Sequence, residues 1–201
     1  MQKAKNIIFR FFSFGLILKY GLICPYKLKP DFLYKSVEFI DIKKLKDFGI
    51  KYVVFDKDNT ITLPLKNNIH NSEIQKKLEL FKKNFGKNNI GIFSNSIFSK
   101  KQREFINFTK NCDIPIIEHS LPKPYGGNSI FNHFGIKNSS KNNKEIAIIG
   151  DRLFIDVLMA KQYNFISVLI KPIDRSKDSI TTKIIRIFEL LLKKNSKFKI
   201  N

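Results

Sequence analysis

The sequence predicts an α/β domain in which a central parallel sheet is covered by helices on both faces. Three observations support this fold class. Short apolar runs without charged residues recur along the chain, as in strands that are buried on both faces. The segments between them place apolar residues at helical spacing and often end at glycine. The two patterns alternate, which is the order expected of βα units that build a parallel sheet.

Five apolar runs are the expected strands of this sheet. They are Tyr52–Phe55, Ile90–Phe93, Ile114–Ile117, Ile146–Ile149 and Phe165–Ile170. The first reads YVVF and has no charged residue, which is typical of a strand at the centre of a parallel sheet. Pro115 lacks a backbone N–H donor, so its strand is expected at an edge.

Six segments are the expected helices, four of them between these runs, one before the first run and one after the last. They are Ile42–Phe48, Ser72–Phe85, Ser99–Lys110, Asn128–Phe134, Phe154–Tyr163 and Ile180–Lys194. In the second, Ile74, Leu78 and Phe81 share one face, and Gly86 follows the last apolar position. The run KNSSKNNK at residues 137–144 is of low complexity and is expected to form a surface loop.

The length of 201 residues suits one domain and an additional segment. We expect the domain over residues 36–195 and a basic, apolar N-terminal segment over residues 1–35. Hydrophobic residues make up 43% of the chain, which excludes a wholly disordered protein. The only two cysteines are Cys24 and Cys112, which excludes a disulfide framework and a multi-cysteine zinc site.

The formal net charge of +20 has two explanations. Lys, Ile, Phe and Asn together make up about half of the chain, so a compositional bias could place lysine wherever a solvated side chain is tolerated. Alternatively, the charge attracts an anionic partner such as a phosphorylated substrate, a lipid surface or a nucleic acid. The composition alone leaves both explanations open.

The first 30 residues combine positive charge with apolar side chains. Their six basic residues are Lys3, Lys5, Arg10, Lys19, Lys27 and Lys29, and they include no acidic residue. The apolar stretch is too short for a membrane span and is interrupted by Lys19. These properties are typical of a mitochondrial presequence or an interfacial membrane anchor. An ordinary N-terminal helix or strand that packs on the domain is the alternative.

Polar residues follow four of the expected strands. They are Asp56, Asp58, Asn59 and Thr60 after the first, Ser94 and Asn95 after the second, Glu118, His119 and Lys123 after the third, and Asp151, Arg152 and Asp156 after the fourth. Ligands of open parallel sheets bind beyond the carboxyl ends of the strands. Paired acids suit Mg²⁺, hydroxyl and ammonium groups suit phosphoryl oxygens, and a carboxylate can serve as nucleophile. Lys57 is expected at the surface, and His119 is expected to pack within its loop.

These motifs resemble the haloacid dehalogenase superfamily of phosphohydrolases. Its D-x-D-x-T motif after an apolar strand corresponds to VVFDKDNT at residues 53–60. The hydroxyl residue that ends the next strand corresponds to Ser94, the lysine to Lys123, and the acidic motif to GDRLFID at residues 150–156. A single D-x-D is a weak signal, but four motifs in order, each after its own expected strand, are specific.

The resemblance implies a role for each acidic residue. Asp56 is the nucleophile that forms an aspartyl-phosphate, and Asp58 protonates the leaving oxygen before it activates water. Asp56, the main-chain carbonyl of Asp58 and Asp151 hold Mg²⁺, with Asp156 nearby. These assignments follow from the family motif and not from the spacing alone.

The resemblance also implies residues that bind the substrate. Ser94 and Lys123 bind the phosphate and stabilise charge in the transition state. Thr60, Asn95 and Arg152 are further candidates. Thr60 is expected to order the first loop, and a structural role is the alternative for Asn95 and Arg152.

The spacing of the motifs leaves no room for a large cap domain. Asp58 and Ser94 are separated by 35 residues, and one helix and one strand use most of them. The site is therefore expected to be open. An open site suits a phosphate carried by a lipid headgroup, a protein or a nucleic-acid end.

The residues that flank the motifs narrow the resemblance to one branch of the superfamily. LKDFGIKYVVFDKDNTIT, IPIIEHSLPKP and IAIIGDRLFIDVLMA resemble the branch of mitochondrial phosphatidylglycerophosphate phosphatases and their bacterial relatives, over roughly residues 15–190. The resemblance implies hydrolysis of phosphatidylglycerophosphate to phosphatidylglycerol, on the way to cardiolipin. It also implies a peripheral protein on the matrix face of the mitochondrial inner membrane, with an anionic phospholipid as substrate.

Two alternatives stay open, one within the enzymes and one from a different functional class. A capless phosphatase of the same superfamily could act on a nucleic-acid 3′-phosphate or a phosphoprotein. No nucleic-acid-binding motif occurs, so no nucleic-acid partner is expected. A non-catalytic membrane-binding module could keep the fold, but a lost enzyme has no reason to keep all the motif residues. The oligomeric state and the processing of the N-terminus stay open.

Overall fold

The computed structural model of the protein describes residues 25–98, 108, 112–176, 178, 183 and 185–187. The expected helices at 99–110 and 180–194 lie outside the described residues, apart from isolated positions. Most of the N-terminal segment, residues 1–24, also lies outside them.

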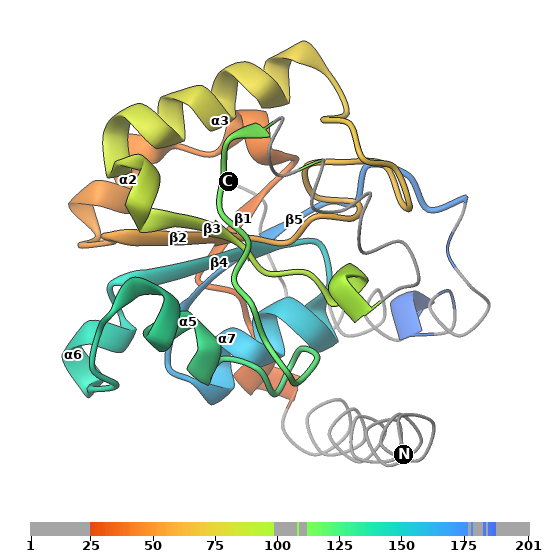
Figure 1. Cartoon of the computed structure of the whole chain (residues 1–201). Helices are drawn as coiled ribbons and strands as arrows, with labels where there is room; N and C mark the ends of the chain where they lie inside the picture. Colours follow the sequence, from red (N-terminus) through yellow and green to blue (C-terminus); the bar gives the residue numbers. More distant parts are fainter. Residues whose placement is uncertain are drawn as a thin grey trace.

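Five parallel strands form one sheet with the order β1-β5-β4-β2-β3 (Figure 1). The strands are β1 (Phe32–Tyr34), β2 (Tyr52–Phe55), β3 (Ile90–Ile92), β4 (Ile146–Gly150) and β5 (Ile166–Ile170). All residues of β4 and β5 are buried, as expected of strands covered on both faces. The predicted α/β fold class is confirmed.

Helices cover both faces of the sheet, with α2 and α3 on one side and α5, α6 and α7 on the other (Figure 1). The helices are α2 (Ile42–Asp47), α3 (Ser72–Phe85), α5 (Asn128–Phe134), α6 (Ser140–Asn143) and α7 (Leu158–Gln162). Shorter 3₁₀ turns are η2 (Pro25–Leu28), η3 (Val37–Phe39), η4 (Lys87–Asn89) and η5 (Asn95–Phe98), and η6 (Leu153–Val157) is a π-helical turn.

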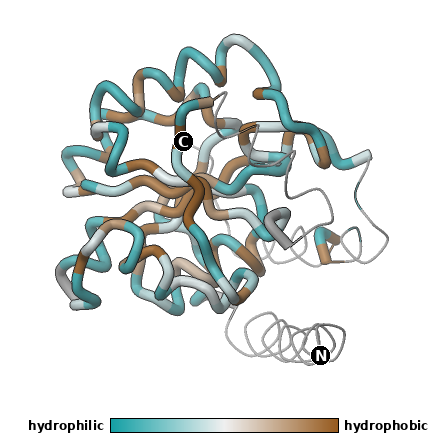
Figure 2. The backbone as a smooth tube through the Cα atoms, viewed as in Figure 1, coloured by the Kyte–Doolittle hydropathy of each residue, from teal (hydrophilic) through white to brown (hydrophobic). Residues whose placement is uncertain are grey.

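Successive side chains of β2 point to opposite faces of the sheet and pack in two different hydrophobic cores. Val53 and Phe55 belong to the core beneath α2 and α3, whereas Val54 belongs to the core beneath α5 and α7. Apolar residues concentrate along the strands between the two helical layers (Figure 2). This central packing fixes the strands, and therefore the positions of the loops at their carboxyl ends.

Helix α3 shows how local sequence sets these boundaries. The side chain of Asn71 accepts a hydrogen bond from the backbone N–H of Ile74 at 2.8 Å, which caps the first turn. Gly86 ends the helix with a φ of 86°, a conformation that glycine adopts without strain. Both ends agree with the sequence prediction.

The sequence prediction differs from the structure at both edges of the sheet. Strand β1 was not expected, yet it pairs in parallel with β5 and extends the sheet upstream of residue 36. The run Ile114–Ile117 forms only an isolated parallel bridge between Ile116 and Ile92, at the free side of β3. Its edge position agrees with the argument from Pro115.

The expectation of an irregular loop at residues 137–144 was wrong, because α6 forms there. The side chain of Ser139 accepts a hydrogen bond from the N–H of Asn142 at 3.2 Å and caps this short helix. The composition suggested a loop because all residues of this run are polar, so the capping serine cannot be told from its neighbours.

The connection between β2 and β3 consists of one loop, α3 and η4. This part of the described chain therefore contains no inserted cap domain. No helix among the described residues has the length and hydropathy needed to cross a bilayer.

Candidate active site

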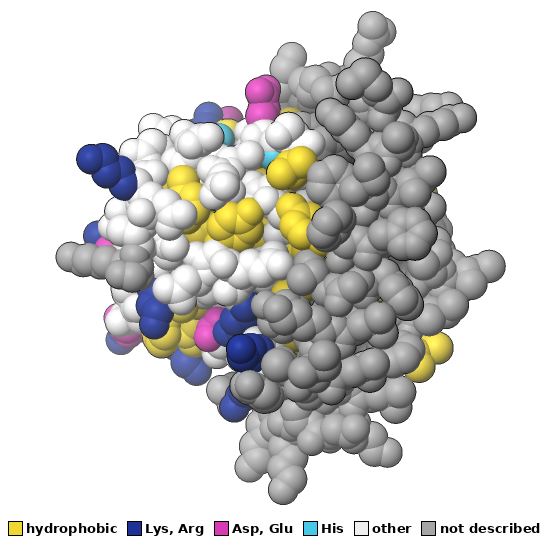
Figure 3. Space-filling view, turned by 90° about the horizontal axis from the view of Figure 1, so that it is seen from below, with side chains coloured by type: hydrophobic (Ala, Val, Ile, Leu, Met, Phe, Trp, Pro, Cys, Tyr) yellow, Lys and Arg dark blue, Asp and Glu magenta, His cyan; other side chains and the backbone are white. Residues whose placement is uncertain are grey.

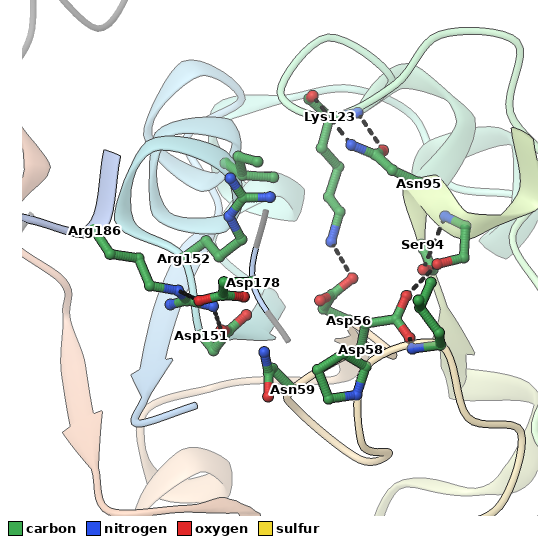
Figure 4. A pocket seen from close by; sticks show the side chains of 14 residues that line it. Asp56, Asp58, Asn59, Ser94, Asn95, Lys123, Asp151, Arg152, Asp178 and Arg186 are labelled. Atoms are coloured by element: carbon green, nitrogen blue, oxygen red, sulfur yellow. Dashed lines mark hydrogen bonds and ion pairs between the residues drawn. The ribbon is translucent and has the colours of Figure 1, made fainter. Parts of the chain in front are cut away.

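A cavity of about 340 Å³ lies at the carboxyl ends of the central strands (Figure 4). Of the nine predicted site residues, seven line it: Asp56, Asp58, Ser94, Asn95, Lys123, Asp151 and Arg152. Asp156 lies directly beside it, in contact with Lys123. Thr60 is the predicted residue that lies away from it.

The strand register brings the motifs together. Phe55 is level with Ile149 on β4 and with Ile92 on β3, so the residues that follow these strands meet at one edge. The N–H of Asp56 donates to the carbonyl oxygen of Ile149 at 2.8 Å. Asp56 is therefore held next to the turn that carries Asp151.

Lys123 joins two of the predicted acids. Its Nζ lies 2.6 Å from Oδ1 of Asp56 and 2.6 Å from Oδ1 of Asp156, and its side chain is almost fully buried. Burial alone lowers the pKa of an ammonium group, but Asp156 and Asp56 outweigh burial and raise the pKa of Lys123. Lys123 is therefore a fixed positive charge in the site.

Asn95 holds the backbone of Lys123 in place. Its Oδ1 accepts the N–H of Lys123 at 2.8 Å, and its Nδ2 donates to the carbonyl oxygen of Lys123 at 3.5 Å. Asn95 also lines the cavity. Its amide thus contacts the motif lysine directly, which supports the structural alternative that the sequence left open.

The nucleophile candidate is a buried carboxyl group. Burial raises the pKa of Asp56 to about 7, although Lys123 lowers it, and Asp156 and Asp151 raise it further. A second cation near Asp56 would favour its ionised, nucleophilic form.

Three carboxylates form a group that fits a hard divalent cation. Asp56, Asp151 and Asp156 each offer an oxygen, and these atoms lie within 4.8 Å of one another. Oδ1 of Asp151 is buried and has no hydrogen-bond partner among the described residues. An all-oxygen set with one unused buried oxygen suits Mg²⁺. The carboxylate of Asp58 is not part of this group, and the expectation for Asp58 concerned its main-chain carbonyl.

Asp58 faces the cavity and is held by three donors. Oδ1 accepts from Nζ of Lys57 at 3.1 Å and from the N–H of Leu65 at 3.1 Å, and Oδ2 accepts from Oγ of Ser96. The expectation that Lys57 is a surface residue was wrong, because its side chain is buried and also donates to the carbonyl oxygen of Lys66. Lys57 stabilises the loop that presents both acids.

Asn59 and Thr60, at the end of the first motif, lie differently with respect to the cavity. Asn59 has a φ of 63°, a left-handed conformation that asparagine tolerates, and its side chain lines the cavity. Thr60 is fully buried and does not line the cavity, so the structure gives no support to a direct contact with substrate. Its Oγ1 is buried and has no hydrogen-bond partner among the described residues, so its part in ordering this loop stays a prediction.

Arg186 is a site residue that the sequence analysis missed. Its Nη2 lies 2.5 Å from Oδ2 of Asp151, and its Nε lies 2.5 Å from Oδ2 of Asp178. Asp151 is held by this contact while its other oxygen stays available. Burial raises the pKa of Asp151 to about 6, and Arg186 lowers it in part.

His119 packs in its loop, as expected. Its ring stacks on Phe93 with a centroid distance of 3.9 Å, and its Nδ1 lies 2.8 Å from the carbonyl oxygen of Ile117. His119 does not line the cavity. The structure therefore places it in the packing beneath the site.

Comparison with known proteins supports the resemblance. The family described as mitochondrial PGP phosphatase matches residues 16–173. Phosphatidylglycerophosphate phosphatase 1, chloroplastic/mitochondrial, from Arabidopsis thaliana is 31% identical over 170 residues, which cover 82% of this chain and 47% of that protein. A mitochondrial phosphatidylglycerophosphatase from Saccharomyces cerevisiae is 34% identical over 115 residues, which cover 56% of this chain and 62% of that protein.

A bacterial relative matches over most of its own length. A probable phosphatase from Bacillus subtilis is 26% identical over 152 residues, which cover 76% of this chain and 82% of that protein. The chain spans about half of the plant relative and about three-fifths of the yeast relative. No solved structure matches the chain. Because the family match includes all five strands and the four motifs in their order, the chain belongs to the family of mitochondrial phosphatidylglycerophosphate phosphatases, within the haloacid dehalogenase superfamily.

Proposed function

We propose that the protein is a Mg²⁺-dependent phosphatase that hydrolyses the terminal phosphomonoester of phosphatidylglycerophosphate. The products are phosphatidylglycerol, a precursor of cardiolipin, and inorganic phosphate. The contact of Lys123 with Asp56, which is one of three buried carboxylates that lie close together, carries this proposal. The names of the plant and yeast relatives support the same substrate.

In the first step, a carboxylate oxygen of Asp56 attacks the phosphorus atom, and the bond from phosphorus to the glycerol oxygen breaks. Asp58 donates a proton to that oxygen as phosphatidylglycerol leaves. In the second step, Asp58 accepts a proton from a water molecule that attacks the phosphorus atom, and the bond from phosphorus to the Asp56 oxygen breaks. Inorganic phosphate leaves, and Asp56 returns to its starting form.

Lys123 and Ser94 are the proposed donors to the non-bridging phosphoryl oxygens, where they stabilise the charge of the transition state. Lys123 is buried with Asp56, so the ammonium group acts in a medium of low dielectric constant. Mg²⁺, held by Asp56, Asp151, Asp156 and the proposed carbonyl of Asp58, would reduce the repulsion between the attacking carboxylate and the anionic phosphate.

The proposed setting is the surface of an anionic membrane. The relatives from yeast and Arabidopsis carry mitochondrial names. We propose peripheral attachment to the matrix face of the inner membrane, with the basic segment of residues 1–35 as the contact. The absence of an inserted cap between β2 and β3 supports access for a lipid headgroup.

Phosphate release from defined substrates tests this function. Phosphatidylglycerophosphate in mixed micelles should be hydrolysed far faster than sugar phosphates, and EDTA should abolish the reaction. Oligonucleotides with a 3′-phosphate and a phosphopeptide, assayed in parallel, represent the alternative substrates. Comparable rates on any of these substrates would contradict the lipid assignment.

A further inference from the structure

One arginine on the cavity wall has no ion-pair partner among the described residues. Arg152 follows Asp151 at the end of β4 and lines the cavity. Its Nε is buried, and it donates no hydrogen bond to any group in the described part of the chain. A buried guanidinium nitrogen without a partner is costly, which suggests that a ligand completes its hydrogen bonding.

The other cations of the cavity already contact carboxylates of the protein. Lys123 contacts two carboxylates, and Arg186 contacts Asp151 and Asp178. Within the described residues, Arg152 is thus the lining cation that remains available for an additional anion. The phosphoryl group that reacts is required next to Asp56 and Lys123. An anion at Arg152 would therefore be a second one.

The backbone of Arg152 is held next to Asp156, which contacts Lys123. Its N–H donates to Oδ2 of Asp156 at 3.1 Å, and Asp156 contacts Lys123 through its other oxygen. Figure 4 shows Arg152 on the side of the cavity toward Arg186, across from Asn95, with Lys123 and Asp56 between them. An extended ligand with one end at Asp56 can therefore place its other end near Arg152.

The proposed substrate has such a shape and charge. It carries a terminal phosphomonoester and an internal phosphodiester, separated by one glycerol unit. The cavity of about 340 Å³ is within the usual size range of small-ligand sites. The planar guanidinium of arginine matches the oxygens of a phosphodiester in geometry and charge.

We propose that Arg152 binds the internal phosphodiester of the substrate and thereby distinguishes lipids with two phosphates from lipids with one. This inference rests on the proposed function. It makes Arg152 a determinant of specificity, whereas Ser94 and Lys123 serve any phosphomonoester. A purely electrostatic effect of Arg152 on the neighbouring Asp151 would instead change the rates of all substrates together.

The test compares two lipids in the same mixed micelles, phosphatidylglycerophosphate and phosphatidic acid, which has a phosphomonoester but no phosphodiester. In Arg152→Gln, the ratio of kcat/KM for phosphatidylglycerophosphate to that for phosphatidic acid should fall about tenfold to a hundredfold, as expected for loss of a charged hydrogen bond. The loss should appear mainly as a higher KM. Arg152→Lys keeps the charge without the planar fork and should recover part of the ratio.

Arg175→Gln is the matched control, because Arg175 is exposed and does not line the cavity. It should leave the ratio unchanged. An equal loss on both lipids in Arg152→Gln would overturn the assignment, as would an unchanged ratio. Failure of the wild-type protein to hydrolyse phosphatidylglycerophosphate would instead count against the proposed function, before any variant is compared.

Discussion

Asp56 and Asp151 combine deep burial with proposed roles that require negative charge. Burial raises their pKa values to about 7 and about 6, from an ordinary value of 3.8. Lys123 and Arg186 lower these pKa values only in part. Near neutral pH, a bound divalent cation would therefore compete with protons for the same oxygens.

This competition predicts that stabilisation by Mg²⁺ grows with pH. Because the pKa of Asp56 is higher in the folded protein than in the unfolded chain, the protonated carboxyl stabilises the metal-free fold fully below pH 3.8. This contribution to the free energy of unfolding is lost as the pH rises toward 7. Mg²⁺ binds the ionised form, so it should raise Tm more at about pH 8 than at about pH 5. Thermal unfolding with and without Mg²⁺ at both pH values measures the effect.

Asp56→Asn serves as the control, since the amide does not titrate in this range. The pH dependence of the Mg²⁺ effect should be smaller in this variant. An equal Mg²⁺ effect at both pH values in the wild-type protein would be inconsistent with cation binding at these carboxylates.

Most motif residues could be predicted because they follow an apolar run that becomes a strand. Lys123 follows the run Ile114–Ile117, which forms only an isolated bridge to Ile92. Arg186 could not be predicted, since it meets Asp151 from 35 positions further along the chain and belongs to no recognised motif. Thr60 was expected near the substrate, but the left-handed turn at Asn59 directs it into the loop. Such a turn depends on how the whole loop folds around Lys57.

At the scale of elements, the end of β4 depends on the absence of a side chain. A Cβ atom at Gly150 would lie 2.2 Å from Cγ of Asp156, a carboxylate that also contacts Lys123. The glycine of the GD motif is thus required for close packing of the acidic turn against its own strand.

Gly150→Ala should displace Asp156 and lower both stability and activity. Overpacking of this kind costs about 1–3 kcal/mol of unfolding free energy. Gly91→Ala is a matched control on β3, where the new methyl group would meet the side chain of Ile117 at 2.7 Å, away from Asp156. Both variants should lower Tm, but only Gly150→Ala should also reduce kcat by an order of magnitude or more. An active Gly150→Ala enzyme would contradict the role given to this contact.

Long elements were predicted well because packing and local signals agree. Helix α3 has a capped start, one apolar face and a terminal glycine, and its observed bounds match the predicted ones. Strand β1 has only three residues, and its place in the sheet comes from pairing with β5, far along the sequence. Periodicity does not encode such a long-range partner.

At the scale of the whole molecule, the positive charge of the N-terminal segment says more about a partner than the charge of the rest of the chain. Residues 1–30 carry a formal charge of +6 without any acid, and residues 31–201 carry +14. Figure 3 shows one face on which most of the visible Lys and Arg side chains lie in its lower part, beside Asp or Glu side chains, and a few lie at its rim. Acidic side chains thus accompany the basic ones on this face, whereas residues 1–30 contain no acidic residue.

The N-terminal charges are therefore the better candidates for membrane contact. Replacing Lys3, Lys5 and Arg10 by Gln should weaken binding to vesicles that contain anionic lipid. Each basic residue near such a surface contributes about 1 kcal/mol, so the triple variant should bind on the order of a hundredfold more weakly at low salt. Vesicle co-sedimentation at increasing salt measures this loss.

A control variant with the same change in net charge shows whether vesicle binding depends on where the charges lie or on the net charge of the protein. Lys76, Lys83 and Lys87 are exposed on or beside α3, and their replacement by Gln should change vesicle binding much less. Equal losses in both triple variants would show that binding follows the total charge and not the N-terminal segment.

The central claim is that Asp56 is the nucleophile of a phosphatidylglycerophosphate phosphatase. The most direct measurement is phosphate release from phosphatidylglycerophosphate in mixed micelles with Mg²⁺, for the wild-type protein and for Asp56→Asn. The account predicts rapid release by the wild type and a rate at least about a thousandfold lower for the variant. Retained activity in purified Asp56→Asn, or no release by the wild type, would contradict it.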